Sequence, residues 1–496
     1  MRQIKQLGPC HWVYPTAVHT RFDHSLGALE MAVRMIRAIR GNGDSAEDER
    51  AISPEEECLA RLFALFHDIG HTPFGHILED EFPILPRHDH DPGRIERFLG
   101  TDSPIGRIVR QDLGAELHGR LLDLFFAAAG ATETVGGDGF ILDLITNSVC
   151  ADLLDYLRRD AFFCNIGLDA DYRFLRHLSI AQVCGRRRLA IRLWKQGKGA
   201  PRRDVLNELI RLLDNRYLMG ERVYFHHAKL IAGTMVASAV ARARRAGEIA
   251  DECLHAIGDD VLLHLLRQCR EPAARRLAER LAERRLWKRI YERSRGAMAA
   301  DQQALRSVNL ASALRRRFHD SPSRLIDEED RLGGMLGLGP GDLLIHCPHP
   351  NMASKLADCL VYWNGEPRPL KDCADDELVG SRLASILAAH RNLWAFRAFL
   401  NPDRIDARDR AADALDCALC YEPSRARRLA RAFGEPLLRE IVRQNRCGQT
   451  MAAEQADARL EQALARFSET SEPKRTREDA EAIARWAFLG GESDGA

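Results

Sequence analysis

The sequence of 496 residues lacks the features of several special protein classes. Its first residues, MRQIKQLGPCHWVYP, contain no apolar signal-peptide core, and no run of about 20 uncharged apolar residues is present to span a membrane. Lys+Arg and Asp+Glu each total 72, so net charge indicates neither a nucleic-acid nor a membrane partner. The 13 cysteines are scattered, and the close pair Cys417 and Cys420 lies in a stretch typical of a helix face. We therefore expect a cytoplasmic protein with reduced thiols and no membrane partner.

The composition is that of a folded protein with strong helical patterning. Hydrophobic residues make up 45% and charged residues 29%, which is ordinary for a globular chain, and the length predicts several domains or a large helical body. Apolar residues recur at helical spacing over 25–40, and Ser53 and Pro54 form a typical helix start for 53–70. Residues 139–160 predict one more strong helix. Further helices are expected at 203–219, 221–246, 258–269, 272–296, 376–436, 451–468 and 476–489.

Extended segments are expected in one part of the chain only. DLLIHCPHP (342–350) and CLVYWNGEPRPL (359–370), the latter with an Asn-Gly turn, predict a small sheet module. The predicted fold is therefore mainly α-helical. We expect a catalytic body over 1–335, a small α+β module over 336–375 and a helical C-terminal region over 376–496.

The richest chemistry lies in FHDIGHTPFGHILEDEF (66–82). His67 and Asp68 are adjacent near the expected end of a helix, while His24 begins one helix and Asp152 lies on another. Mixed imidazole and carboxylate ligands suit a hard or borderline divalent metal. Each residue alone is more often a hydrogen-bonded or surface side chain, but the four in this order and with these flanks predict a mononuclear metal site.

These motifs resemble a known family. RFDHSLG (21–27), HDIGHTPFGH (67–76) and DLLDYLRRD (152–160) are similar to the HD-domain phosphohydrolases, and more closely to the deoxynucleoside triphosphate triphosphohydrolases of the sterile-alpha-motif-and-HD-domain type and their bacterial relatives. The likeness runs from IKQLG (4–8) to RYLMGERVYFHH (216–227), and it implies an HD-domain helical core. In that family His24, His67, Asp68 and Asp152 match the four metal-ligand positions.

The resemblance also implies roles for three histidines. His71 and His76 match positions close to the α-phosphate and the leaving 5′ oxygen, where one of them would act as a general acid. RHDHDPGRIERF (87–98) matches a segment with a third active-site histidine. Counting back from Phe98 selects His90, with His88 as the alternative register and a solvated polar loop as the competing interpretation.

Substrate contacts follow from the same likeness. Arg21 and Arg216 match positions that hold the triphosphate. Tyr156 and Asp160 match positions that read the 2′ and 3′ sides of the sugar. Gln6 and Leu7 match the other side of the sugar pocket, and Tyr224 matches a position near the base.

The sequence departs from the family in two positions and at its start. Leu153 replaces the lysine that usually follows the fourth metal ligand, and Gly220 replaces a histidine near the triphosphate. The family also has residues before the IKQLG segment that form part of an effector-nucleotide site. Either the chain begins late or this effector site is missing or remodelled, so activation by a nucleotide effector is left open.

The function predicted is metal-dependent hydrolysis of deoxynucleoside triphosphates to deoxynucleoside and inorganic triphosphate. The cofactor expected is one divalent ion per site, with Mn, Fe, Zn or Mg left open, and additional Mg accompanying the triphosphate is compatible with it. The family likeness implies a homo-oligomer. A second hypothesis keeps the site but changes the substrate to another nucleotide or to single-stranded nucleic acid.

A third hypothesis is a nucleotide-binding regulatory or assembly protein. Its motivation is ARRLAERLAERRLWKRIYERSR (274–295), which carries a basic stripe with Trp287 and Tyr291 and would contact nucleic acid or a partner protein. A solvated helix face is the commoner meaning of such a stripe.

Overall fold

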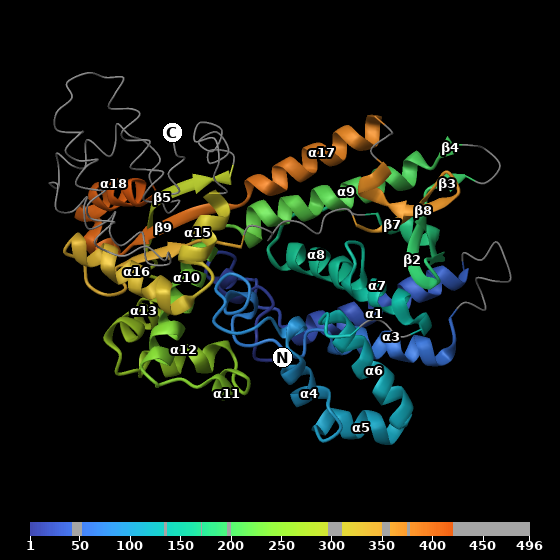
Figure 1. The fold of residues 1–496 in the computed structure, drawn as a ribbon, viewed down its shortest axis with the longest axis horizontal. Coiled ribbons are helices and arrows are strands. Elements are labelled where there is room, and N and C mark those ends of the chain that lie inside the picture. Colours follow the sequence, from blue (N-terminus) through green and yellow to red (C-terminus); the bar gives the residue numbers. More distant parts are fainter. Residues whose placement is uncertain are drawn as a thin grey trace, which may run out of the picture. The chain divides into compact units, whose positions relative to one another are not determined.

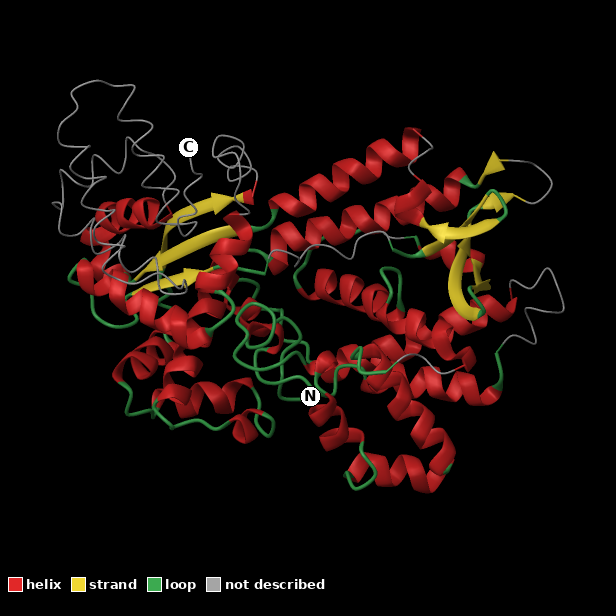
Figure 2. Cartoon of the chain, in the orientation of Figure 1, coloured by secondary structure: helices red, strands yellow, loops and turns green. Residues whose placement is uncertain are grey.

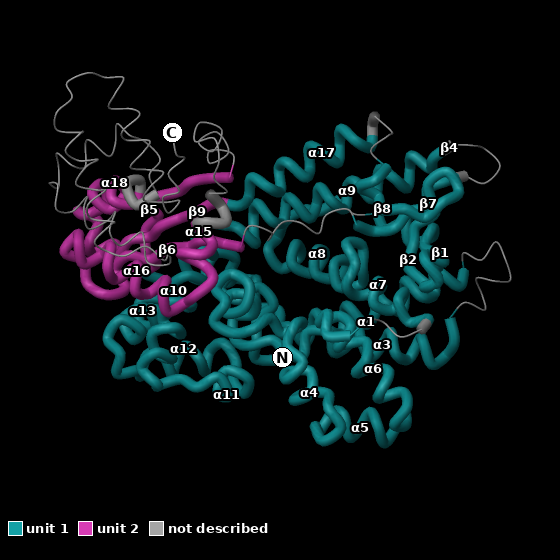
Figure 3. Tube along the Cα trace, viewed as in Figure 1, with its two compact units in different colours: residues 1–285, 351–394 teal, residues 286–350, 395–496 magenta. Residues whose placement is uncertain are grey.

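The computed structural model describes residues 1–41, 52–132, 136–169, 171–195, 200–295, 310–349, 358–373 and 377–419. The fold is mainly α-helical, as the sequence predicts, with a few short strands (Figures 1 and 2). Two compact units divide the chain (Figure 3). Unit 1 comprises Met1–Arg285 and Asn351–Trp394, and unit 2 comprises Leu286–Pro350 and Ala395–Ala496.

Unit 1 contains the helices that carry the predicted site. One of the site helices, α3, begins with a capping box in which the Ser53 hydroxyl accepts from the Glu56 amide and the Glu56 carboxylate accepts from the Ser53 amide. Helix α1 packs against both α3 and α8. The α-helices of unit 1 are α1 (Arg21–Gly41), α3 (Pro54–Phe66), α4 (Pro92–Leu99), α5 (Pro104–Leu113), α6 (Ala115–Ala128), α7 (Gly139–Thr146), α8 (Ala151–Phe163), α9 (Arg203–Met219), α10 (His227–Arg245), α11 (Asp251–Leu254), α12 (Asp259–Arg267), α13 (Pro272–Ala282) and α17 (Glu377–Asn392).

The strands of unit 1 form a four-stranded and a two-stranded sheet. The first has the order β1-β2-β7-β8, in which β2 pairs parallel to β7 and the other neighbours pair antiparallel. The parallel pair brings a segment near residue 360 back beside a segment near residue 190. The strands are β1 (Leu178–Val183), β2 (Arg186–Arg192), β3 (Trp194–Lys195), β4 (Ala200–Pro201), β7 (Leu360–Trp363) and β8 (Glu366–Pro369).

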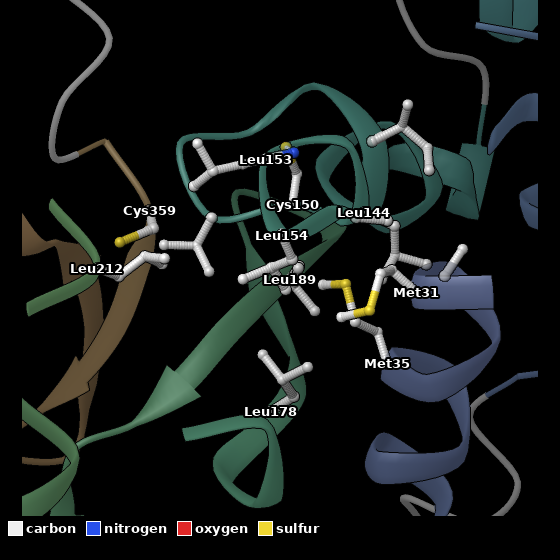
Figure 4. Close-up of a cluster of buried hydrophobic side chains, with 14 of the residues drawn as sticks. Met31, Met35, Leu144, Cys150, Leu153, Leu154, Leu178, Leu189, Leu212 and Cys359 are labelled. Atoms are coloured by element: carbon white, nitrogen blue, oxygen red, sulfur yellow. Dashed lines mark hydrogen bonds between the residues drawn. The ribbon is translucent and has the colours of Figure 1, made fainter. Parts of the chain in front are cut away.

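One hydrophobic core of unit 1 lies beneath the site helices. Met31 and Met35 of α1, Leu154 of α8 and Leu189 of β2 are among its buried members, and part of this core is seen in Figure 4. Cys150 is also buried in this core. Burial of this apolar surface fixes α1 against α8 and therefore sets the relative positions of the residues at the two helix starts.

In its described residues, unit 2 has a three-stranded antiparallel sheet with the order β5-β9-β6, together with three α-helices. Within this unit the Trp287 indole N–H donates to the carbonyl oxygen of Gly341. Its elements are β5 (Lys288–Ser294), α15 (Leu310–Phe318), α16 (Pro322–Met335), β6 (Leu343–His346), β9 (Ala395–Leu400) and α18 (Arg408–Leu419).

The structure corrects the expectations for 336–375 and for the segment after it. The strands expected there are present, but β6 belongs to the sheet of unit 2 whereas β7 and β8 belong to the sheet of unit 1, so they form no module of their own. Of the helices expected over 376–436, α17 and α18 are present, with strand β9, whose side chains are all buried, between them; residues 420–436 lie outside the described part of the chain. The helices expected at 451–468 and 476–489 lie outside the described residues.

Two long helices expected from the sequence are also wrong. Residues 139–160 form α7 and α8, because Asn147 is extended and Cys150 starts a new helix as its N-cap. The expected helix over 272–296 ends at Ala282, and strand β5 follows. Trp287 and Tyr291 are both buried in unit 2, so 274–295 presents no continuous basic helix face.

Candidate metal centre and active-site pocket

Three helix ends bring the four predicted metal ligands together. His24 lies in the first turn of α1, His67 is the C-cap of α3 and is followed by Asp68, and Asp152 lies in the first turn of α8. His24 Nε2 is 3.2 Å from His67 Nε2 and 3.0 Å from Asp152 Oδ1. His67 Nε2 is 3.6 Å from Asp152 Oδ1 and 3.5 Å from Asp68 Oδ1. The four side chains therefore face one common point.

The Nδ1 atoms of His24 and His67 already have hydrogen-bond partners in the protein. His24 Nδ1 lies 2.8 Å from Asp155 Oδ2, and His67 Nδ1 lies 2.7 Å from the carbonyl oxygen of Ala64. Both partners are acceptors, so each Nδ1 carries the proton and each Nε2 offers its lone pair toward the common point. Metal-binding histidines are usually supported in this way. The donor set therefore fits a divalent metal, although its identity is not determined by it.

The Asp155 side chain is held in place by an arginine, and a glycine on the neighbouring helix leaves the space that it occupies. The Arg159 guanidinium donates from Nε and Nη2 to the two oxygens of Asp155, each at 2.8 Å. At Gly27 of α1, a Cβ would lie 1.9 Å from Asp155 Oδ1. The glycine of the RFDHSLG motif thus leaves the space in which the carboxylate reaches His24.

The electrostatics of this group favour a positive charge at its centre. Burial opposes protonation of His24, but its hydrogen bonds to Asp152 and Asp155 raise its pKa to about 10. For Asp152, burial would raise the pKa, but hydrogen bonds from His24 and His67 hold it well below its usual range. The carboxylates therefore stay ionised and the site attracts a cation.

The segment after Asp68 turns sharply and adds further histidines. Phe74 and Gly75 have φ angles of 60° and 59°, and a Cβ on Gly75 would lie 2.6 Å from an Nη2 atom of Arg21. His71 is buried, and burial together with Arg21 and His88 holds its pKa well below the usual range. His76 is half-exposed. Burial would lower its pKa, but the hydrogen bond from Nδ1 to Asp80 Oδ2, at 2.9 Å, raises it.

For the third histidine, the structure supports the alternative register. The His88 side chain is 7% exposed, lines the same pocket as His67 and stacks on His71 with ring centroids 3.5 Å apart. The His90 side chain is 55% exposed and does not line that pocket. The structure thus places His88, the alternative register, at the pocket, and leaves the first choice, His90, exposed outside it.

A single pocket joins this centre to the predicted sugar and phosphate contacts. Its volume is about 420 Å³. All seven residues expected to contact substrate line it, namely Gln6, Leu7, Arg21, Tyr156, Asp160, Arg216 and Tyr224. His67, Asp68, Asp152 and His76 line it as well, whereas His24 and His71 lie behind its wall.

Several contacts fix the side chains of this pocket. The Tyr224 hydroxyl donates to Asp160 Oδ2 at 2.9 Å, and the ring of Tyr156 lies edge-on to that of Tyr224. Arg21 Nη1 donates to Asp68 Oδ2 at 2.6 Å, so this guanidinium contacts a predicted metal ligand. Leu153 is buried and lines the pocket where the family has lysine. At Gly220, a Cβ would lie 3.0 Å from a methyl carbon of Leu393, so that packing fills the place of the family's histidine side chain.

Sequence reasoning missed several residues of the site. Asp155 supports His24, and its position three residues after Asp152 on one helix was an available signal. His19 Nε2 lies 2.8 Å from Asp160 Oδ1, and Lys229 pairs with Glu81 at the pocket wall. Glu79 lies between His88 and Arg94. No local sequence pattern indicates the last three contacts, because each joins residues from separate segments.

Comparison with known proteins agrees with this geometry. Residues 21–113 match the HD domain, and residues 210–414 match the HD associated region. The chain is 29% identical over 246 residues to the uncharacterized protein YwfO of Bacillus subtilis, covering 49% of each chain. It is 26% identical over 267 residues to the human deoxynucleoside triphosphate triphosphohydrolase SAMHD1, covering 49% of this chain and 40% of that protein.

A putative HD domain-containing protein of Acanthamoeba polyphaga mimivirus is 27% identical over 238 residues, which is 46% of this chain and 48% of the viral protein. The chain thus spans about half the length, or less, of these curated relatives. Fold, site and matches together define the class: this chain contains an HD domain followed by an HD associated region. Among the described helices, none is both long and apolar enough to cross a membrane.

Proposed function

We propose that the protein hydrolyses deoxynucleoside triphosphates to deoxynucleoside and inorganic triphosphate. The observation that carries this proposal is the shared pocket, in which the metal-ligand set and the expected sugar and phosphate contacts line one cavity. The 26% identity to human SAMHD1, named a deoxynucleoside triphosphate triphosphohydrolase, supports it at a distance.

In this proposal the side chains divide the substrate between them. Arg216, half-buried in the pocket near Tyr156, binds phosphate oxygens through its guanidinium group. Asp160 accepts a hydrogen bond from the 3′-hydroxyl group. Its carboxylate oxygens keep lone pairs for this contact in addition to those that face His19 and Tyr224. Tyr156 crowds the 2′ position and so disfavours a ribose hydroxyl. Gln6 and Leu7 complete the sugar pocket.

The chain also supplies the proton for the leaving group. His76 is half-exposed on the pocket wall, and Asp80 raises its pKa despite the opposing effect of burial. It is therefore protonated near neutral pH and donates a proton to the 5′ oxygen as the ester bond breaks. His71 is held neutral behind the wall and is the poorer donor. A divalent metal bound by His24, His67, Asp68 and Asp152 supplies Lewis-acid chemistry that activates water and offsets phosphate charge.

A second candidate substrate carries fewer phosphates. Its support is the pair of substitutions on one side of the pocket, where buried Leu153 and the closely packed Gly220 offer no cation to a triphosphate. A nucleoside monophosphate would need neither contact.

Product analysis tests both candidates. The purified chain is incubated with Mn²⁺ or Mg²⁺ and each dNTP, with and without other nucleotides as effectors, and the products are separated. We expect deoxynucleoside and inorganic triphosphate, and no product from the Asp152→Ala variant. Absence of triphosphate under every condition, or release of phosphate from deoxynucleoside monophosphates alone, contradicts the proposal. Homo-oligomer formation, which the family likeness implies, is tested by sedimentation of the same samples with and without nucleotide.

A further inference from the structure

Helix α12 begins at a buried carboxylate that contacts two segments of the pocket. Asp259, the first residue of α12, is only 1% exposed. Its Oδ1 accepts from the backbone amide of Phe74 at 2.7 Å, and its Oδ2 accepts from the backbone amide of Lys5 at 2.9 Å. Phe74 lies two residues before His76, and Lys5 immediately precedes Gln6. One side chain therefore joins the segment of the expected proton donor to the segment of the expected sugar contacts.

The turn at Phe74 has a backbone that its surroundings must hold. Its φ angle of 60° lies in the left-handed region, which residues with a side chain rarely adopt. Such a conformation persists where neighbouring groups fix it. The ring of Phe74 is buried and stacks on that of Trp12, with centroids 6.3 Å apart, while its backbone amide is bound to Asp259. Trp12 and Asp259 thus hold the turn from its two sides.

The N-terminal segment packs closely against both the turn and α12. A Cβ at Gly8 would lie 3.0 Å from the carbonyl oxygen of Phe74. At Gly258, the N-cap of α12, a Cβ would lie 2.4 Å from the Cβ of Gln3. The backbone amide of Asp259 donates to the carbonyl oxygen of Gln3 at 3.0 Å. The N-terminal segment, the turn and the start of α12 are therefore in direct contact with one another.

The next residue of α12 is an acid in a different environment. The side chain of Asp260 is 89% exposed, and its Oδ1 lies 3.1 Å from Lys5 Nζ. A solvated ion pair of this kind contributes little to stability. Loss of Asp259, in contrast, would leave two backbone amides without their acceptors in a buried place. Asp260 is therefore a matched control for Asp259.

The geometry points to Asp259 as a positioning residue that holds Gln6 and Leu7 in register with His76. Asp259 does not line the pocket, so it acts through the two segments and not on the substrate. While both hydrogen bonds are made, a deoxynucleotide bound at Gln6 and Leu7 presents its 5′ oxygen to His76. The catalytic part of this inference rests on the proposed function, whereas the joining of the two segments does not.

Hydrogen–deuterium exchange of the full chain tests the joining of the segments without a substrate. Peptides that cover residues 3–8 and 72–77 are followed by mass spectrometry. Asp259→Ala removes both acceptors, and we expect about tenfold faster exchange in both peptides, with the rest of the chain unchanged. The milder Asp259→Asn retains one acceptor oxygen and should speed exchange in at least one of the two. Asp260→Ala should leave both peptides unchanged.

Steady-state kinetics with a dNTP and Mn²⁺ tests the positioning. We expect Asp259→Asn to raise KM and to lower kcat by about tenfold each, because the sugar contacts and the proton donor both shift. Bound Mn²⁺ should stay unchanged. A role in stability alone would lower only the amount of active enzyme, which changes kcat and bound Mn²⁺ but not KM. Asp260→Asn should keep both kinetic constants, and thermal unfolding shows whether each variant is folded.

Faster exchange in neither segment of either Asp259 variant, or an equal rise over the whole chain, overturns the inference. So does Asp259→Ala if it is folded and only one segment exchanges faster. An unchanged KM with a kcat that falls in proportion to bound Mn²⁺ also contradicts it. If the unchanged protein hydrolyses no deoxynucleotide, the proposed function fails, whereas the exchange measurement still decides whether Asp259 joins the two segments.

Discussion

The helical half of the site, from α1 and α8, and its loop half, between Asp68 and α4, position histidines by different means. In the helical half, His24 and Asp155 meet because two packed helices share a hydrophobic core, and Gly27 leaves room between them. In the loop half, the positive φ angles of Phe74 and Gly75 turn the chain, and Glu79 and Arg94 hold His88. A helix pair fixes its residues by packing, whereas the loop depends on a buried polar network.

Asp68 contacts both halves, through His67 and His71, so its removal should have the largest effect. We expect Asp68→Ala to lower kcat/KM by on the order of 10⁴-fold, because it removes a predicted metal ligand and leaves Arg21 without its carboxylate. Bound metal should fall with activity. Phosphoester hydrolysis and bound Mn²⁺ are measured together. Full metal binding in the variant would show that Asp68 is not a metal ligand.

The second largest effect is expected from removal of the proton donor, which should slow the chemical step without changing metal binding. We expect His76→Gln to lower kcat by roughly 10²- to 10³-fold with metal content unchanged. The Asp80 carboxylate raises the pKa of His76, so the protonated acid is present below this raised pKa and is lost as pH rises through it. The alkaline fall in the kcat profile of the unchanged protein should therefore disappear in the variant. An unchanged alkaline limb would assign the proton to another group.

The outer carboxylates provide the most direct comparison of the two halves. We expect Asp155→Asn to weaken binding of the metal ion by about 10- to 100-fold, because an amide supports the His24 Nδ1 proton less well than a carboxylate does. Asp169→Asn, at an exposed acid paired with Arg211, is the control and should bind metal normally. Titration with Mn²⁺ measures both.

The same change in the loop half sharpens the comparison. Glu79→Gln should weaken the support of His88 and lower kcat, and it should leave Mn²⁺ binding unchanged. Loss of Mn²⁺ binding in Glu79→Gln would show that the loop half also supports the metal ligands.

The helical half was more predictable from the sequence than the loop half, for a physical reason. His24, His67, Asp68 and Asp152 lie at helix ends, where periodicity and capping residues fix the register, and the structure brings them together. In the loop half, the sequence favoured His90 over His88, whereas the structure buries His88 against Glu79 and leaves His90 exposed. Strands β5 and β9 were missed because they pair over long sequence separations, which no local pattern reveals, whereas the extended segments that contain β6 and β7 were expected.

The smallest effect tests the packing on which the helical half depends. Alanine at Gly27 places a Cβ 1.9 Å from Asp155 Oδ1, and we expect it to destabilise the fold by about 1–3 kcal/mol and to weaken metal binding as Asp155 moves from His24. Gly119→Ala is the matched control. It lies within helix α6 with no atom within 4 Å of the added Cβ, and it should stabilise the fold by about 0.5–1 kcal/mol.

Chemical unfolding and Mn²⁺ titration measure the two glycine variants side by side. A loss of stability in Gly27→Ala without a change in metal affinity would separate the packing of α1 on α8 from the orientation of His24. Parallel loss of both would mean that the helix contact itself sets the position of the metal ligand. That outcome would explain why the RFDHSLG motif places a glycine one turn after its histidine.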